Sequence, residues 1–357
     1  MLTLWLINHL SAIIKACHNF LLYELSNLKQ KKEIKEWANR IKDGDRQALS
    51  QAITLIESSN IEDRQLARSL IDFIEPWTGN SLRIGITGPP GVGKSTLIDK
   101  IGVVFIGQSH KVAVLTIDPS SALSKGSILG DKSRMANLST QANAFIRPSP
   151  SSLNLGGLAL YTREAMLLCE AAGFDRILIE SVGVGQSEFL ISLLCDMTLL
   201  LLQPHSGDEM QGIKRGVMEW ADMYIITKTD GETFNGSNKT YIELNSILNF
   251  VPRKYSFWTP KIVQLSVISD LGMSSLMDNI DLFYNLLIND NQLYKLRLKQ
   301  SETYFKVQWA KMIEQYILMN RANVELINFL AAEVGHGNMS SEKAFDKLLK
   351  FIFATLK

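Results

Sequence analysis

The sequence predicts an α/β fold: a doubly wound, mainly parallel sheet with one helical region before it and another after it. Between residues 81 and 280, short apolar runs rich in β-branched residues alternate with helical runs. This is the pattern of strands buried on both faces of a parallel sheet. Residues 31–80 and 281–357 show helical periodicity without such runs. The expected strands are Arg83–Thr87, Val112–Ile117, Phe145–Arg147, Arg176–Val182, Met197–Gln203, Met223–Thr227 and Ile262–Leu265.

The N-terminal part of the chain predicts two helical segments. Residues 1–30 are expected to form an amphipathic extension, because Leu6, Leu10 and Leu21 fall on one helical face opposite a polar stripe. That stripe argues against a transmembrane segment, and leaves packing on protein or binding at a membrane surface as the two alternatives. Residues 31–80 are expected to form a helical domain in which Gly44 ends one helix and Asp45 caps the next.

The C-terminal part, residues 281–357, predicts long helices. Apolar side chains such as Phe305, Trp309 and Met312 recur at helical spacing. An apolar face on a helix needs a covering partner. The segment therefore suits a helical hairpin, a dimerisation arm, or both.

The bulk properties exclude several function classes. The 357 residues carry 37 Lys and Arg against 36 Asp and Glu, so charge gives no reason to expect a nucleic-acid partner. The three cysteines are far apart and form no C-x-x-C pair, which is typical of reduced thiols in a cytoplasmic protein. The five histidines show no metal-ligand spacing.

The organising motif is a phosphate-binding loop that fits G-x-x-x-x-G-K-[ST] between an expected strand and an expected helix. Its glycines let backbone N–H groups turn onto phosphate oxygens, and the helix N-terminus adds partial positive charge. Lys94 can reach the β- and γ-phosphates, and Ser95 can ligate Mg²⁺. Residues 81–280 are thus expected to form a P-loop NTPase domain. Its loop contacts to nucleotide are Gly88, Pro89, Pro90, Gly91, Val92, Gly93, Lys94, Ser95 and Thr96.

A second motif lies at the end of the fourth expected strand, where an apolar run ends in Glu180 and Gly183 stands three residues further on. A carboxylate at this place can meet Mg²⁺ or its bound water, and a glycine N–H can meet the γ-phosphate. Most GTPases have Asp here, so the longer Glu180 is a departure. It predicts a catalytic and metal-binding carboxylate that acts directly or through water.

The third motif, Thr227–Asp230, follows another apolar strand and resembles the guanine-recognition pattern [NT]-K-x-D. A carboxylate placed like Asp230 can accept two hydrogen bonds from guanine, whereas adenine would leave it unpaired. The Lys228 stem can lie along the purine. Ser266 and Val267, after the last strand, are expected to support the base. The motif predicts GTP and GDP as the ligands rather than ATP.

Two further acidic residues follow the second strand, Asp118 and Asp131. Either can ligate Mg²⁺ directly or through water, and Gly126 and Gly130 between them suit a mobile switch loop. A second polar, glycine-bearing loop spans residues 204–216. It is not needed to bind nucleotide, so we expect it to contact a partner.

Together these motifs resemble the methylmalonyl-CoA mutase-associated GTPases of the MeaB/MMAA type, once labelled ArgK transport kinases. The resemblance runs from about Trp37 to the C-terminus and includes Thr162–Glu164 and Glu333–Gly337. It implies a GTPase of the SIMIBI class that acts as a chaperone of an adenosylcobalamin-dependent acyl-CoA mutase, usually methylmalonyl-CoA mutase. Such proteins couple GTP hydrolysis to cofactor loading and to protection of the mutase.

The resemblance also implies roles for individual positions. Lys94, Glu180 and Asp131 become catalytic residues, and the Mg²⁺ ligands become Ser95, Asp118, Asp131 and Glu180. Residues 204–216 become the switch that senses the mutase, and 281–357 the homodimer arm. Thr227 in place of the usual Asn departs from the family pattern.

Two alternatives remain open. A SIMIBI metallochaperone would normally carry clustered His or Cys ligands, and the sequence shows no such cluster. A small-molecule or protein kinase, as in the old ArgK label, would need a pocket for the phosphate acceptor, and no motif indicates one.

Overall fold

The protein is described by a computed structural model over residues 31–58, 60–118, 134–150, 155–181, 187–204, 218–230 and 234–355. The chain divides into two compact units, with the boundary between Leu293 and Tyr294. Among the residues described, no helix combines the length and the apolar character needed to cross a membrane.

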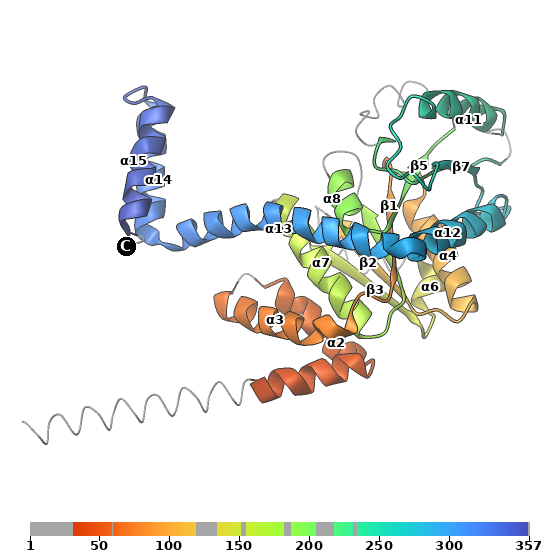
Figure 1. Cartoon of the computed structure of the whole chain (residues 1–357), viewed down its shortest axis with the longest axis horizontal. Helices are drawn as coiled ribbons and strands as arrows, with labels where there is room; N and C mark the ends of the chain where they lie inside the picture. Colours follow the sequence, from red (N-terminus) through yellow and green to blue (C-terminus); the bar gives the residue numbers. More distant parts are fainter. Residues whose placement is uncertain are drawn as a thin grey trace, which may run out of the picture. The chain divides into compact units, whose positions relative to one another are not determined.

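The first unit is built on one seven-stranded sheet of order β3-β2-β4-β1-β5-β6-β7, in which every paired strand runs parallel (Figure 1). The predicted doubly wound sheet is therefore confirmed, with all seven expected strands present. Their bounds are β1 Leu82–Thr87, β2 Val112–Asp118, β3 Ala144–Pro150, β4 Arg176–Ser181, β5 Met197–Leu202, β6 Met223–Ile226 and β7 Lys261–Gln264.

One strand is longer than the sequence predicts. β3 continues to Pro150, whereas the expected strand ended at Arg147 before the first proline. β3 lies at the edge of the sheet and pairs with β2 alone. An edge strand tolerates proline, because an N–H on its outer side has no neighbour to bond.

Helices cover both faces of the sheet (Figure 1). α7, α8 and α11 pack over one face, and α4, α6 and α12 over the other. Strands buried on both sides explain the continuous apolar runs in the sequence. The helix bounds are α4 Lys94–Gly107, α6 Ala136–Ser139, α7 Leu155–Ala171, α8 Ser187–Leu194, α11 Phe234–Leu248 and α12 Met273–Ile288.

The N-terminal helices share the hydrophobic core of the sheet. Helical residues 31–42 are followed by α2 (Arg46–Ile56), α3 (Ile61–Ile74) and the short η1 (Glu75–Trp77). Gly44 has φ 83° and Asp45 caps α2 by accepting from two backbone amides, so the predicted stop and cap are confirmed. One core cluster joins Leu49 of α2 to Ile177 of β4.

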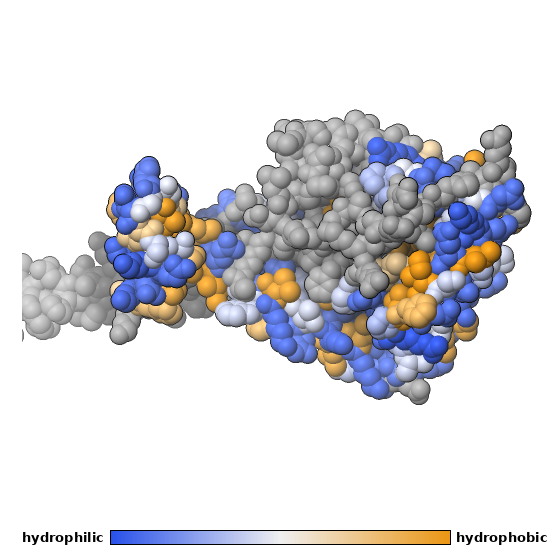
Figure 2. All heavy atoms as spheres, turned by 90° about the horizontal axis from the view of Figure 1, so that it is seen from above, coloured by the Kyte–Doolittle hydropathy of each residue, from blue (hydrophilic) through white to orange (hydrophobic). Residues whose placement is uncertain are grey.

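The second unit consists of helices. α13 (Gln292–Met319) enters it, and α14 (Arg321–Gly335) and α15 (Ser341–Thr355) pack together. Asn320 caps α14. Hydrophobic side chains lie at the surface of these helices among hydrophilic ones (Figure 2). Of the described aromatic side chains in this unit, the most exposed are those of Tyr294, Phe305, Phe329, Phe345 and Phe353.

Candidate functional site

The phosphate-binding loop joins β1 to α4, and two of its glycines are fixed by geometry. At Gly88, φ is 146° and an added Cβ would lie 2.6 Å from the carbonyl oxygen of Leu201. At Gly93, φ is 98°, and this residue caps α4 without a capping side chain. The first amides of α4 are therefore left for another acceptor, and a phosphate suits them in charge and direction.

Lys94 is buried at the start of α4, with 8 % of its surface exposed. Its Nζ donates to the carbonyl oxygens of Gly88 (2.8 Å) and Pro89 (3.0 Å). Burial lowers the pKa of the Lys94 ammonium, and the nearby Glu180 carboxylate partly offsets that effect. The Lys94 ammonium is thus held over the phosphate-binding loop, where phosphate oxygens would replace the water that burial removes.

Ser95 and Glu180 meet at the ends of α4 and β4. The Ser95 hydroxyl donates to Oε1 of Glu180 over 2.9 Å. The backbone of Glu180 lies between Ile86 and Thr116 in the sheet. Next to it, Ser181 donates to the hydroxyl of Thr87 over 2.8 Å, which fixes the end of β4 against β1.

The Ser95–Glu180 pair fits a Mg²⁺ ion. Adjacent ligands of an octahedron at 2.0–2.1 Å from the metal are about 2.9 Å apart, and the two oxygens have this separation. No cluster of three or more His, Cys, Asp and Glu side chains occurs in the described ranges. Mg²⁺ commonly completes its coordination with phosphate and water, and the side chains of the other two predicted ligands, Asp118 and Asp131, are not described.

The third motif is bonded to the phosphate-binding loop. Thr227, at the end of β6, donates to the carbonyl oxygen of Val92 over 2.8 Å. Lys228 donates from Nζ to the carbonyl oxygen of Gly91 over 2.9 Å. Lys228 has φ 55°, a left-handed backbone that turns the chain sharply after the strand. The two segments therefore form one site although 135 residues separate Thr227 from Val92.

Asp230 is oriented by the loop after β7. Ser266, which is buried, donates to Oδ2 of Asp230 over 2.8 Å. The same Ser266 oxygen accepts from the backbone amide of Ser269, so the hydroxyl is held from both sides. Val267, half-buried, follows it in the turn. A fixed carboxylate beside the loop can accept hydrogen bonds from a purine edge.

Several predicted site residues lie outside the described residues. They are Asp131, Gly183 and residues 205–216. The backbone of Asp118 ends β2 and pairs with Pro150 of β3, but its side chain is not described. Pro89, Pro90 and Thr96 lie in the loop or at the start of α4, where Pro90 and Thr96 are exposed.

The structure also shows a residue that sequence reasoning missed. Asp99 of α4 accepts from the backbone amide of Leu138 (2.7 Å) and from Nδ2 of Asn137 (2.7 Å). It thereby anchors α6, which follows the predicted switch loop, to the helix of the phosphate site. The sequence could have indicated this role, because Asp99 lies between Ile98 and Ile101 on a buried helix face. A carboxylate buried there is stable only when it is hydrogen-bonded.

Comparison with known proteins agrees with this geometry. The family model described as "Methylmalonyl Co-A mutase-associated GTPase MeaB" matches residues 49–323. A "Putative GTPase" of Caulobacter vibrioides is 41% identical, over 89% of this chain and 97% of that protein. The "GTPase ArgK" of Escherichia coli is 38% identical, over 89% and 96%.

Two further relatives extend the comparison. The "Methylmalonic aciduria type A homolog, mitochondrial" of Mus musculus is 40% identical, over 86% of this chain and 76% of that protein. Among solved structures, the "LAO/AO transport system kinase" superposes with a TM-score of 0.70 at 33% identity, over 89% of this chain and 97% of that one. The chain therefore belongs to the family of methylmalonyl-CoA mutase-associated GTPases of the MeaB type.

Proposed function

We propose that the protein is a Mg²⁺-dependent GTPase that serves as a chaperone of an adenosylcobalamin-dependent acyl-CoA mutase, specifically methylmalonyl-CoA mutase. The observation that carries the proposal is the single site formed by the phosphate-binding loop and the Thr227–Asp230 segment. Family membership and the name of the mouse relative support the mutase as client. We place this activity in the cytoplasm.

In this proposal, the chain's own groups hold the triphosphate and neutralise the charge that develops during hydrolysis. Backbone amides of the loop and the Lys94 ammonium bind the β- and γ-phosphates. Ser95 and Glu180 hold Mg²⁺, which supplies charge stabilisation at the phosphate oxygens. Asp118 and Asp131 are further proposed Mg²⁺ and switch carboxylates, and the Gly183 amide a proposed γ-phosphate contact.

Base selection is assigned to Asp230. The hydrogen bond from Ser266 supports this role, because a carboxylate held in one orientation discriminates better than a mobile one. Guanine offers it two donors, at N1 and at the exocyclic N2, whereas adenine has an acceptor at N1 and no amine at the neighbouring position. The ligands are therefore GTP and GDP.

The partner loop is proposed to be 204–216. It follows β5, a strand whose neighbour β1 leads into the phosphate-binding loop. A loop at this edge of the sheet can respond to the γ-phosphate and to a bound protein. GTP hydrolysis would then be coupled to cofactor loading and to protection of the mutase.

A homodimer through the C-terminal helices is also proposed. On α15, Phe345, Leu349 and Phe353 recur every four residues and are 64%, 50% and 64% exposed. Residues four apart share one helical face, so the three side chains form an apolar stripe. A second copy of the same arm is the occupant proposed for it.

The decisive experiment measures GTP turnover of the full chain with and without purified methylmalonyl-CoA mutase. A rise in turnover on adding the mutase, with no turnover of ATP, is expected. Unchanged turnover with every acyl-CoA mutase tested would overturn the partner assignment. Transfer of the labelled γ-phosphate to an acceptor other than water would overturn the hydrolase assignment.

A further inference from the structure

An open cleft lies along the outer edge of β3, away from the nucleotide site. Its volume is about 270 Å³. Residues 144–148 of β3 line it, together with Arg46 and Ser50 of α2 and Ser139 of α6. β3 is the last strand on this side of the sheet, and β2 and β4 separate it from β1. The cleft is therefore distinct from the phosphate-binding loop that follows β1.

Among the described residues, the polar side chains that line the cleft are of types that can donate hydrogen bonds, although the Ser139 hydroxyl already donates to the carbonyl oxygen of Ala136. They are two arginines, Arg46 and Arg147, and two serines, Ser50 and Ser139. No carboxylate of the described residues belongs to the lining. A wall that offers two guanidinium groups and the Ser50 hydroxyl selects a ligand rich in acceptor oxygens and negative charge.

Arg46 lines the cleft, and only some of its N–H groups donate hydrogen bonds within the described protein. Its Nη2 donates to the carbonyl oxygens of Ala144 (2.7 Å) and Ala142. Its Nε and Nη1 donate to no residue in the part of the chain that the structure describes. The guanidinium is thus oriented by backbone contacts before any ligand binds, which lowers the entropic cost of binding.

Arg147, the second arginine of the lining, is held by α2. Its Nη2 binds Glu57 (2.6 Å) and Thr54 (3.3 Å) of α2, but its Nε is buried without a partner among the described residues. The acids near the cleft are already engaged, because Glu57 pairs with Arg147 and Asp45 pairs with Arg40. The uncompensated charge of Arg46 therefore gives the cleft a net positive charge.

We propose that this cleft is a second anion site, which binds a small molecule through a phosphate group. Nε and Nη1 of Arg46 can each donate a charge-assisted hydrogen bond to a phosphate oxygen, and phosphate carries more charge than a single carboxylate. At about 270 Å³, the cleft has room for a phosphate with a small attached group. An added peptide strand is disfavoured, because Arg46 already occupies the outer carbonyl of Ala144 and Pro148 has no N–H to pair.

The test is calorimetric titration of the full chain with inorganic phosphate, in the presence of saturating Mg²⁺ and GDP to fill the nucleotide site. We expect binding that Arg46→Gln weakens at least tenfold, while Arg40→Gln, on the neighbouring helix outside the cleft lining, leaves it unchanged. Lys94→Ala should also leave it unchanged, since Lys94 belongs to the phosphate-binding loop.

Three outcomes overturn the proposal. They are absence of phosphate binding, equal binding by the Arg46→Gln variant, and loss of binding in Lys94→Ala, which would place the phosphate in the nucleotide site. Succinate that binds more tightly than phosphate would overturn the phosphate class. If Arg46→Gln fails to fold, Ser50→Ala replaces it, with an expected weakening of about threefold to tenfold.

Discussion

The contact between Ser95 and Glu180 explains how glutamate can stand where aspartate is usual. Glu180 lies at the end of β4, and its longer side chain reaches the Ser95 hydroxyl directly. Only 8 % of Glu180 is exposed, so an uncompensated negative charge here would be costly. The Ser95 hydroxyl and the nearby Lys94 ammonium stabilise it, and the proposed Mg²⁺ would stabilise it further.

Glu180→Gln tests the metal role. The amide keeps the shape of the side chain but loses the charge, so affinity for Mg²⁺ should fall. We expect the Mg²⁺ concentration for half-maximal GTP hydrolysis to rise about 10–100-fold, as measured by Mg²⁺ titration of the turnover rate. Glu219→Gln, at an exposed position, is the control. An unchanged Mg²⁺ dependence in Glu180→Gln would refute the assignment.

Asp230→Asn tests base recognition. An amide can pair with the xanthine edge but offers guanine a donor where an acceptor is needed. Affinity for GTP should fall about 10–150-fold, which corresponds to the free energy of a hydrogen bond to a charged group. Xanthosine triphosphate should become a ligand. The measurement is the affinity of each variant for both nucleotides. The control variant is Asp270→Asn, because Asp270 is an exposed acid in the loop after β7. Equal GTP affinity in Asp230→Asn and the native protein would contradict the role.

At the scale of elements, the conformation of the phosphate-binding loop depends on the close approach of Gly88 to β5. Gly88→Ala would place a methyl group 2.6 Å from the Leu201 carbonyl oxygen, at a φ of 146°. The loop must shift, so nucleotide affinity should fall at least about tenfold. Gly107→Ala, at the end of α4 with open space around it, should keep native affinity. Equilibrium binding of GDP distinguishes the two, and native affinity in Gly88→Ala would show that the loop is not held as described.

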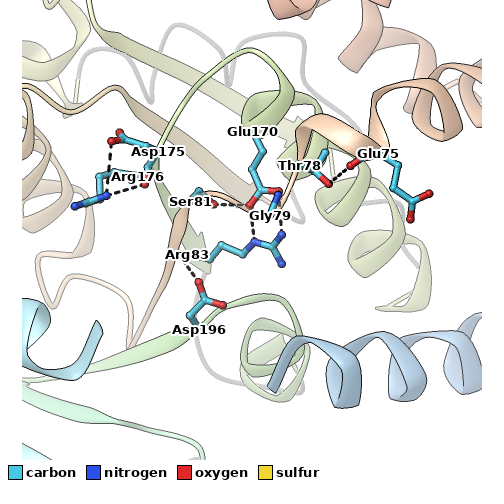
Figure 3. A network of polar contacts seen from close by, with 9 residues as sticks. All are labelled: Glu75, Thr78, Gly79, Ser81, Arg83, Glu170, Asp175, Arg176 and Asp196. Atoms are coloured by element: carbon cyan, nitrogen blue, oxygen red, sulfur yellow. Dashed lines mark hydrogen bonds and ion pairs between the residues drawn. The ribbon is translucent and has the colours of Figure 1, made fainter. Parts of the chain in front are cut away.

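A second element-scale feature is a buried polar network that joins α7 to β1 and to the chain before it (Figure 3). Glu170 of α7 accepts from Arg83 (2.8 and 2.9 Å), from the amide of Gly79 (2.8 Å) and from Ser81. The Arg83 amide donates to Asp196 over 2.9 Å. Burial by itself would raise the pKa of Glu170, but the Arg83 charge and the hydrogen bonds outweigh it and leave that pKa below its usual value.

Glu170→Gln should therefore destabilise the fold by about 3–5 kcal/mol, because Arg83 would remain buried without a counter-charge. A lowered carboxyl pKa contributes stability above the unfolded-state value near pH 4.5, and this contribution is lost as pH falls through the folded-state pKa. The difference in urea stability between the native protein and the variant should be full at pH 7 and should shrink below pH 4.5. A constant difference down to pH 3 would contradict the charge argument. Glu243→Gln, in a surface pair, should cost less than 1 kcal/mol.

At the scale of the whole molecule, the sequence predicts elements better than their arrangement. All seven strands were predictable, because strands buried on both faces must be apolar throughout. Their order was not, since an apolar run does not specify its neighbour. The bond from Thr227 to Val92 joins positions 135 residues apart, and no periodicity in the sequence indicates it. The roles of Asp118 and Asp131 stay predictions.

The prediction at this largest scale concerns the oligomeric state and the C-terminal unit. If the apolar stripe of α15 is a dimer contact, Phe353→Ser should shift the protein toward the monomer at micromolar concentration. Lys347→Ser, two residues beyond Phe345 and on the opposite face of the helix, should not. Sedimentation velocity measures both. A native protein that is monomeric would refute the dimer proposal, and an unchanged dimer in Phe353→Ser would place the contact on another face.

The hydrogen bonds from Thr227 and Lys228 to the glycine loop also bear on the thermodynamics of binding. A loop free in solution would lose conformational entropy when a phosphate ordered it, at about 1–2 kcal/mol for each residue fixed. Here the bonds to Gly91 and Val92 restrict the loop when the chain folds. Nucleotide affinity is thereby tied to the integrity of the end of β6. Heating that loosens this strand end would speed nucleotide dissociation before the rest of the sheet unfolds.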